Sequence, residues 1–172
     1  TVLSGVGNGS GFYIDAEGGY LLTNHHVIGD SKYVKVRLAS GRELVGEVLR
    51  SDSARDVALV KTEQVALRPL PVSVQAPAVG DELVAIGSPF GETFASSLTK
   101  GVLSGTSVVK EFKYLQSDVK VLPGSSGGPL IRRDGSVVGI VQGGVGVTPG
   151  ATVNLFVPID EALSRLAIDI KR

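Results

Sequence analysis

The stretch L-P-G-S-S-G-G-P-L, at residues 122–130, is the most informative part of this sequence. It holds two adjacent serines, Ser125 and Ser126, between glycines, and glycine permits close backbone approach and positive φ angles. A serine on such a loop has bare N–H groups beside its hydroxyl, which is the geometry that acyl transfer needs around a nucleophile. The same residues are also typical of an ordinary Gly/Ser turn before a strand. The two interpretations differ in whether the chain also supplies a histidine and an aspartate to serve the serine.

Charge and composition exclude several classes of protein. The 172 residues include 17 basic and 17 acidic side chains, so no net basic field favours nucleic acid and no charge run favours a membrane surface. Apolar runs are short and interrupted by Gly or Pro, so we expect no membrane insertion. The chain has no cysteine, which excludes a disulfide framework, a thiolate nucleophile and a cysteine zinc site.

The order of apolar stretches and turns predicts an all-β fold. Short apolar stretches alternate with turn residues at a spacing typical of barrels or sandwiches. We expect strands at residues 9–14, 20–23, 33–38, 43–49, 57–61, 83–87, 101–107, 114–117, 129–132, 137–141 and 153–157. Residues 67–80 carry three prolines, which supply no ladder donor, and we expect them to connect two halves. After Pro158, apolar residues such as Leu163 and Leu166 recur at helical spacing, which predicts a C-terminal helix.

Candidate partners for the serine exist in the first half of the chain. The only histidines, His25 and His26, follow an expected strand. A metal site is disfavoured there, because neighbours on a strand point to opposite faces and no other His or Cys completes a zinc set. Asp56 precedes an apolar run at the edge of the interior, where a carboxylate needs a partner such as a histidine N–H. Each residue alone has an ordinary structural interpretation, but the order His, Asp, Ser is one known for the serine triad.

Five stretches, spread over nearly the whole chain, share one resemblance. They are G-N-G-S-G-F at residues 7–12, L-T-N-H-H-V-I at 22–28, D-V-A-L-V-K at 56–61, A-I-G-S-P-F-G at 85–91 and L-Q-S-D-V-K-V-L-P-G-S-S-G-G-P-L at 115–130. In this order they resemble the protease domain of the HtrA/Deg family, within the trypsin-like serine proteases. The resemblance implies two six-stranded antiparallel β-barrels packed at right angles, followed by a short C-terminal helix.

The resemblance also implies a domain organisation. We expect one trypsin-like serine protease domain over residues 1–172. Its parts are a first barrel with the His and Asp at 1–68, a connector at 69–80, a second barrel with the Ser at 81–157 and the C-terminal helix at 158–172.

Catalytic roles follow from the same resemblance. The family's catalytic histidine directly precedes Val-Ile, which identifies His26, and its nucleophile precedes Gly-Gly-Pro, which identifies Ser126. Asp56 then orients the histidine, and the N–H groups of Gly124 and Ser126 form the oxyanion hole. The sequence departs from the family at Ser125, where asparagine is usual.

A second departure affects the expected specificity pocket. The strand edge that pairs with substrate reads I-V-Q-G-G-V-G at residues 140–146, where the family often has Asn-Thr and bulkier residues. We expect the substrate-binding residues to be Val121, Leu122, Gln142, Gly143, Gly144, Val145 and Val153. None is charged, so we expect a small or medium aliphatic residue before the cleaved bond.

The function implied by the resemblance is that of a serine endopeptidase that cleaves unfolded or damaged proteins in protein quality control. It implies polypeptide substrates, no metal or other cofactor, no nucleic acid, and an extracytoplasmic location such as the bacterial periplasm, with chloroplasts and mitochondria as further locations of relatives. We expect a monomer for this segment and leave open an oligomer in a longer protein. Two alternatives stay open: a protease-like module that binds peptides or acts as a chaperone without cutting, and an esterase. The extended edge at residues 138–144 favours peptides over other esters and amides.

Overall fold

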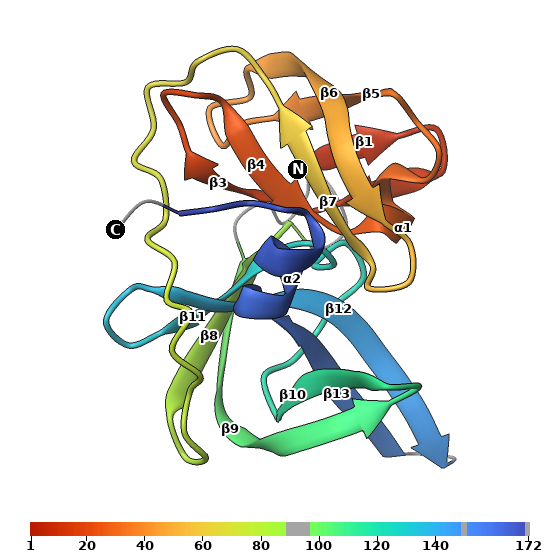
Figure 1. Cartoon of the computed structure of the whole chain (residues 1–172), viewed down its shortest axis with the longest axis vertical. Helices are drawn as coiled ribbons and strands as arrows, with labels where there is room; N and C mark the ends of the chain where they lie inside the picture. The colour runs from red at the N-terminus through yellow and green to blue at the C-terminus, as the bar shows by residue number, and fades with distance from the viewer. Residues whose placement is uncertain (89–96, 149–150, 171–172) are drawn as a thin grey trace.

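Two β units lie one against the other, joined by an extended connector, in a computed structural model that describes residues 1–88, 97–148 and 151–170. The first unit is a seven-stranded sheet in the order β2-β1-β5-β6-β7-β4-β3 (Figure 1). Its strands are β1 (Val2–Ser4), β2 (Gly7–Gly9), β3 (Phe12–Asp15), β4 (Tyr20–Thr23), β5 (Tyr33–Arg37), β6 (Glu43–Asp52) and β7 (Val57–Lys61), with the short helix α1 (His25–Ile28) after β4.

The second unit is a closed barrel in the order β10-β13-β12-β11-β8-β9. Its strands are β8 (Glu82–Gly87), β9 (Ser97–Val109), β10 (Phe112–Ser117), β11 (Pro129–Arg132), β12 (Val137–Thr148) and β13 (Ala151–Pro158), and the helix α2 (Ile159–Arg165) follows. The predicted all-β, trypsin-like architecture with a C-terminal helix is therefore confirmed. The expected six-stranded barrel is found in the second unit, whereas the first unit, among the described residues, is a curled seven-stranded sheet rather than a second closed six-stranded barrel.

One expected strand, at residues 9–14, is divided in two. β2 ends at Gly9 and β3 begins at Phe12. Ser10 and Gly11 lie between them, and Ser10 donates its backbone N–H to the carbonyl of Ser126 at 2.8 Å instead of joining a strand ladder. The prediction of one continuous strand was wrong because it took no account of this long-range contact.

A second difference concerns the two histidines, which we expected at the end of a strand. His25 and His26 instead open the helix α1, directly after Asn24, whose backbone is still extended (φ −89°, ψ 152°). Successive side chains on a helix are rotated by about 100° about its axis, so the two rings still point in different directions. Only one of them is turned toward Asp56, as described below.

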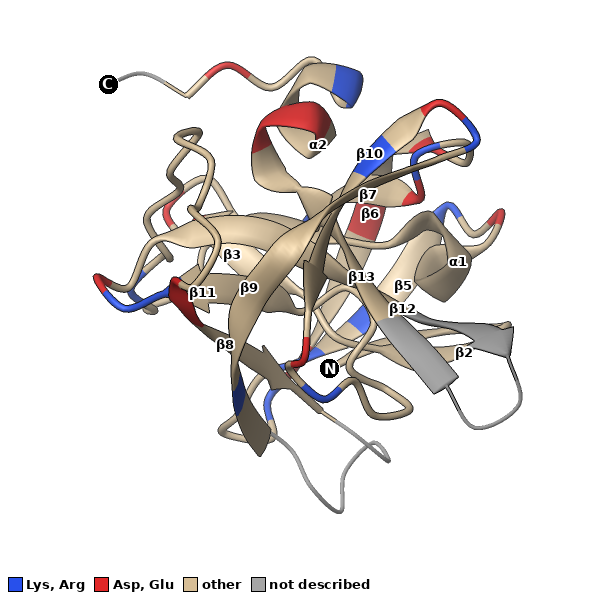
Figure 2. Ribbon diagram, turned by 90° about the horizontal axis from the view of Figure 1, so that it is seen from below, with Lys and Arg blue, Asp and Glu red and all other residues tan. Residues whose placement is uncertain are grey.

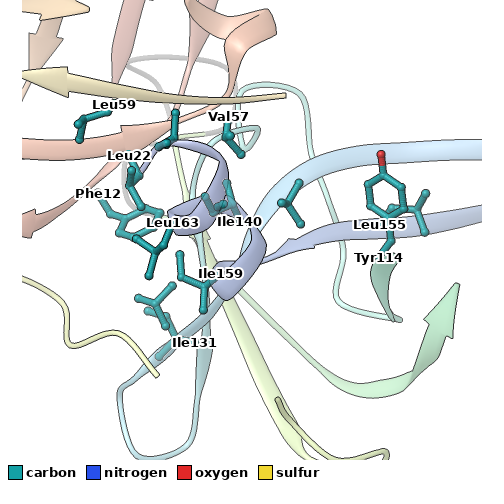
Figure 3. Packing of buried hydrophobic residues seen from close by; sticks show 14 residues of the cluster. Phe12, Leu22, Val57, Leu59, Tyr114, Ile131, Ile140, Leu155, Ile159 and Leu163 are labelled. Atoms are coloured by element: carbon teal, nitrogen blue, oxygen red, sulfur yellow. The ribbon is translucent and has the colours of Figure 1, made fainter. Parts of the chain in front are cut away.

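A shared apolar core holds the two units together. Phe12, Leu22 and Val57 of the first sheet lie in one buried cluster with Ile140 of β12 and Leu163 of α2 (Figure 3). Burial of apolar surface is the main stabilising contribution in a domain. Because the cluster includes residues of both units and of α2, these parts pack as one body. The packing matters for function because the candidate catalytic residues come from both sides of this core.

Positively and negatively charged positions are interspersed along the described part of the chain. The Lys and Arg positions alternate with those of Asp and Glu over the ribbon in Figure 2. In the part of the chain that the structure describes, no helix is both long and apolar enough to cross a membrane.

Candidate active site

His26 and Asp56 form the most direct contact of the site. The His26 Nδ1 atom lies 2.7 Å from Oδ2 of Asp56, and the backbone N–H of His26 donates to Oδ1 at 2.8 Å. A carboxylate at Nδ1 selects the tautomer that carries its proton there, which leaves Nε2 free to accept a proton. The hydrogen bond to Asp56 raises the pKa of His26 above its ordinary value of 6.5, and partial burial opposes this rise.

The backbone at Asp56 is held in an uncommon conformation. Its φ is +63°, in the left-handed region that Asp tolerates better than most residues. The side-chain amide of Asn24, which is fully buried, donates to the Asp56 carbonyl at 2.9 Å. Asn24 was not identified from the sequence as part of the site, although it directly precedes the histidines.

A tight turn forms the loop before the candidate nucleophile. The Ser125 N–H donates to the Leu122 carbonyl at 2.9 Å, with Pro123 second in the turn and Gly124 third at φ +92°. These are the features of a type II turn, in which the third residue needs positive φ. The sequence P-G therefore suits this loop locally.

Two N–H groups of the loop remain free. The Gly127 N–H donates to the Val141 carbonyl at 2.8 Å, and the Gly128 N–H to the Ser125 carbonyl at 3.0 Å. Among the described residues, by contrast, the N–H groups of Gly124 and Ser126 have no acceptor. Two unpaired donors beside a serine hydroxyl are suited to binding an oxyanion.

The two adjacent serines occupy different environments. Ser125 is buried, and a Cβ atom added at Gly87 would lie 3.0 Å from its hydroxyl oxygen, whereas Ser126 is partly exposed. Gly127, next in the chain, has φ +87°, and a Cβ there would collide with the Ser10 carbonyl and the Thr23 hydroxyl. The loop therefore requires glycine at 127 and presents Ser126 rather than Ser125.

Ser10 supports this loop from the first unit. Besides its N–H bond to Ser126, its buried hydroxyl donates to the Gly124 carbonyl at 2.7 Å and accepts the Ser88 N–H at 2.8 Å. Sequence analysis did not single out Ser10, although it lies within the G-N-G-S-G-F stretch. The hydrogen bond could not be predicted from a local pattern, because Ser10 and Gly124 are 114 positions apart in the chain.

The Ser126 hydroxyl does not bond to His26 in this structure. It donates to the Gln142 carbonyl at 3.1 Å. The structure thus joins His26 to Asp56 directly and leaves N–H donors at Gly124 and Ser126 without an acceptor among the described residues, while no hydrogen bond joins Ser126 to His26. Such contacts are often long or misaligned without substrate.

An exposed strand edge begins beside the nucleophile. β12 pairs with β11 only as far as Ile140 and with β13 as far as Thr148. From Gln142 onward, its other edge has no partner among the described strands. An extended peptide can add to such an edge through main-chain hydrogen bonds.

The remaining predicted pocket residues fall into two groups. Val121 and Leu122 precede the loop and are partly buried, and Gln142 and Gly143 lie at a register shift in β12. Gly144 and Val145 lie on β12 and Val153 on β13, where Val145 pairs with Val153, but their side chains lie outside the described residues. The residues that the structure describes contain no group of three or more His, Cys, Asp or Glu that could hold a metal ion.

Comparisons with known proteins agree with this geometry. A family described as "Trypsin-like peptidase domain" matches residues 9–140. A "Probable periplasmic serine endoprotease DegP-like" of Pseudomonas fluorescens is 44% identical over 137 residues, which cover 77% of this chain and 28% of the relative. A protein of the same description from Hahella chejuensis is 40% identical over 161 residues, covering 90% of this chain and 34% of the relative.

Solved structures show the same relationship. The HtrA-type protease AlgW with a decapeptide has a TM-score of 0.82 at 29% identity, over 94% of this chain and 51% of that one. The serine endoprotease from Yersinia pestis has a TM-score of 0.79 at 29% identity, over 91% and 55%. This chain spans only about a third of the curated relatives it matches. It belongs to the trypsin-like peptidase family and is an HtrA/DegP-like serine protease domain.

Proposed function

We propose that this chain is a serine endopeptidase that uses Ser126, His26 and Asp56. The Ser126 oxygen attacks the peptide carbonyl while His26 Nε2 takes the hydroxyl proton, and Asp56 stabilises the resulting cation. The tetrahedral oxyanion is held by the N–H groups of Gly124 and Ser126. As the C–N bond breaks, His26 passes its proton to the leaving amine, and water then hydrolyses the acyl-enzyme. The observation that carries this proposal is the pair of N–H donors at Gly124 and Ser126 that have no acceptor among the described residues, in a chain that also holds a bonded His26–Asp56 pair.

In this proposal, a bound peptide substrate brings about the hydrogen bond between Ser126 and His26, which is not formed in this structure. An extended peptide added to the edge of β12 takes the Gln142 carbonyl as an acceptor, because this is the first unpaired position of the edge. The Ser126 hydroxyl then loses its present acceptor and turns to His26. In this proposal, the substrate itself completes the nucleophile–base contact.

The proposed substrates are unfolded polypeptides, cleaved after aliphatic residues in protein quality control outside the cytoplasm. An open strand edge binds main chain, which a folded protein rarely offers in extended form. The relatives carry the word periplasmic in their names, and one similar structure holds a decapeptide. Both facts support the proposal.

A catalytically latent peptide-binding module is the second candidate function. The hydrogen bond from Ser126 to Gln142, in place of one to His26, favours it. A latent module would bind unfolded chains at the same edge without hydrolysing them.

Digestion of unfolded casein, together with labelling by an organophosphate, tests the proposal. We expect fragments whose termini define the specificity pocket, and a dialkylphosphorylated peptide that contains Ser126. An organophosphate reacts with a serine that has an activated hydroxyl, so labelling reports the catalytic arrangement without a suitable protein substrate. Casein that binds without cleavage, with no labelling of Ser126, would support the latent module instead.

The activity is expected to rise with pH through a transition above pH 6.5. The hydrogen bond that the His26 ring donates to the Asp56 carboxylate raises the pKa of His26, and only the neutral ring can accept the Ser126 proton. Below this pKa, kcat/KM should fall by about tenfold per pH unit. Initial rates of casein cleavage from about pH 5 to about pH 9 measure the transition. A rate that does not change across this range would argue against His26 as the base.

Replacing Ser10 by alanine is expected to lower kcat by roughly tenfold to a hundredfold, less than the loss of one whole oxyanion donor. The change leaves the Gly124 carbonyl without its donor and the Ser88 N–H without its acceptor, so the loop that carries the free N–H groups loosens. The control is Ser136→Ala, which removes another buried hydroxyl, bonded to Asp134 at 2.6 Å. Equal kcat values for the two variants would show that Ser10 does not support the loop.

A further inference from the structure

Arg55 is the largest fully buried side chain in the described part of the molecule. Its Nε lies 2.9 Å from Oε2 of Glu161, and its Nη2 donates to the Lys113 carbonyl. Its guanidinium carbon lies 4.4 Å from the centre of the Tyr114 ring and 5.0 Å from that of Phe112. Arginine over aromatic faces is attracted by their π-electrons, more strongly where water is excluded.

These contacts cross from one unit of the molecule to the other. Arg55 lies in the loop between β6 and β7 of the first sheet, while Phe112 and Tyr114 lie on β10 of the barrel and Glu161 on α2. The next residue along the chain is Asp56, whose carboxylate holds His26. One peptide unit thus joins a buried anchor in the second unit to the carboxylate of the candidate triad.

The loop between the anchor and β6 is short and internally bonded. The Arg55 N–H donates to Oδ1 of Asp52 at 2.7 Å, and Asp56 follows at φ +63°. A left-handed residue other than glycine persists only where its surroundings hold it. The Arg55 anchor on one side and the Asn24 amide on the other supply that constraint.

A gain in folding stability does not by itself explain why a charged side chain is buried at position 55. Burial lowers the pKa of Arg55, and the Glu161 carboxylate opposes this. Buried ion pairs are commonly no more stabilising than apolar side chains of similar volume. The Nε and Nη1 atoms also have no hydrogen-bond acceptor among the described residues, so Glu161 acts through its charge rather than a directed hydrogen bond.

We propose that Arg55 is a positioning residue, which anchors the β6–β7 loop to the second unit and thereby holds the Asp56 carboxylate against His26. The proposal rests on the peptidase function proposed above. Arg55 does not touch the reacting atoms and acts only through Asp56. The charged and titratable groups around it are Glu161 and Arg165 on α2, Tyr114 on β10 and Asp52 on β6, and the group facing His26 is Asp56.

The test replaces Arg55 by methionine, which keeps an apolar side chain between the rings and removes the charge. The matched control is Arg50→Met, because Arg50 also reaches from β6 to the end of α2, where its Nη1 donates to the carbonyls of Leu166 and Ala167 at 2.7 and 2.8 Å. Arg50 therefore ties the same elements together without being adjacent to Asp56. Glu161→Gln is the second test variant, since it removes the partner charge while keeping the shape.

Two readouts follow the His26–Asp56 contact. In Arg55→Met we expect kcat for casein to fall by about tenfold to a hundredfold with KM little changed, as for other losses of catalytic orientation. The midpoint of the acidic limb of the pH profile shifts to lower pH, toward the ordinary pKa of histidine, because a looser Asp56 contact no longer raises the pKa of His26. Direct titration of His26 by NMR measures the same change without turnover.

The outcomes separate this proposal from the peptidase function. A lower His26 pKa in Arg55→Met, with the pKa in Arg50→Met like that of wild type, supports the positioning role even if no casein is cleaved. If Arg55→Met does not fold, Glu161→Gln decides by the same titration. The role of Arg55 would be overturned by an unchanged His26 pKa in whichever of the two test variants is folded. An equal shift of this pKa in Arg50→Met would overturn it too.

Discussion

Ser126→Ala is expected to abolish peptide cleavage, with kcat lower by about 10⁶. Alanine removes the oxygen that forms the acyl-enzyme, whereas the N–H donors at Gly124 and at position 126 and the His26–Asp56 pair remain. Binding of unfolded casein should persist, because the edge of β12 is unchanged. Steady-state cleavage at saturating casein, with binding measured in parallel, gives both quantities.

Ser125→Ala is the matched control for this change. It removes the neighbouring hydroxyl, which is buried beside Gly87. We expect Ser125→Ala to keep most of the activity. Equal activity of Ser126→Ala and wild type would overturn the nucleophile assignment, and a loss confined to Ser125→Ala would transfer the role to Ser125.

Asp56→Asn is expected to lower kcat by about 10⁴ while leaving the fold intact. An asparagine amide can present an N–H to Nδ1, which would then accept and leave the proton on Nε2, the atom that must take the proton from Ser126. Because the hydrogen bond to the Asp56 carboxylate raises the pKa of His26, the residual activity should also show its acidic transition at lower pH than wild type. Cleavage rates across the pH range measure both effects.

The control for this variant is Asp134→Asn, which alters a carboxylate in the turn between β11 and β12 that bonds to Ser136. We expect its rate and pH profile to match those of wild type. An acidic transition in Asp56→Asn that stays at the wild-type position would show that the carboxylate does not set the protonation of His26.

Local patterns in the sequence predicted the architecture well. Alternation along residues 33–37 buries Val34 and Val36 and exposes Lys35, as a half-buried strand requires. The prolines of residues 67–80 kept most of the connector out of the sheets, with one isolated bridge between Val72 and Val137. These predictions succeeded because side-chain alternation and missing N–H donors act within a few residues.

Chemistry that depends on a short motif was also visible in the sequence. The P-G pair predicts the tight turn at residues 122–125, and Gly127 has the positive φ that only a small residue tolerates there. The candidate residues His26, Asp56 and Ser126 were assigned by resemblance to a family. Their catalytic roles remain predictions that the variants above test.

Contacts between distant segments were decided only by the tertiary structure. Ser10 meets Gly124 across 114 positions, and Arg55 meets Lys113 across 58 positions. The division of the strand at residues 9–14 and the choice of Gln142 as the present acceptor of the Ser126 hydroxyl have the same origin. The sequence by itself determined most of the strands, because these depend on neighbouring residues, and it supplied the candidate triad through the resemblance of its motifs to a family. The supports behind the triad depend on how two units pack over a common core, which no local pattern records.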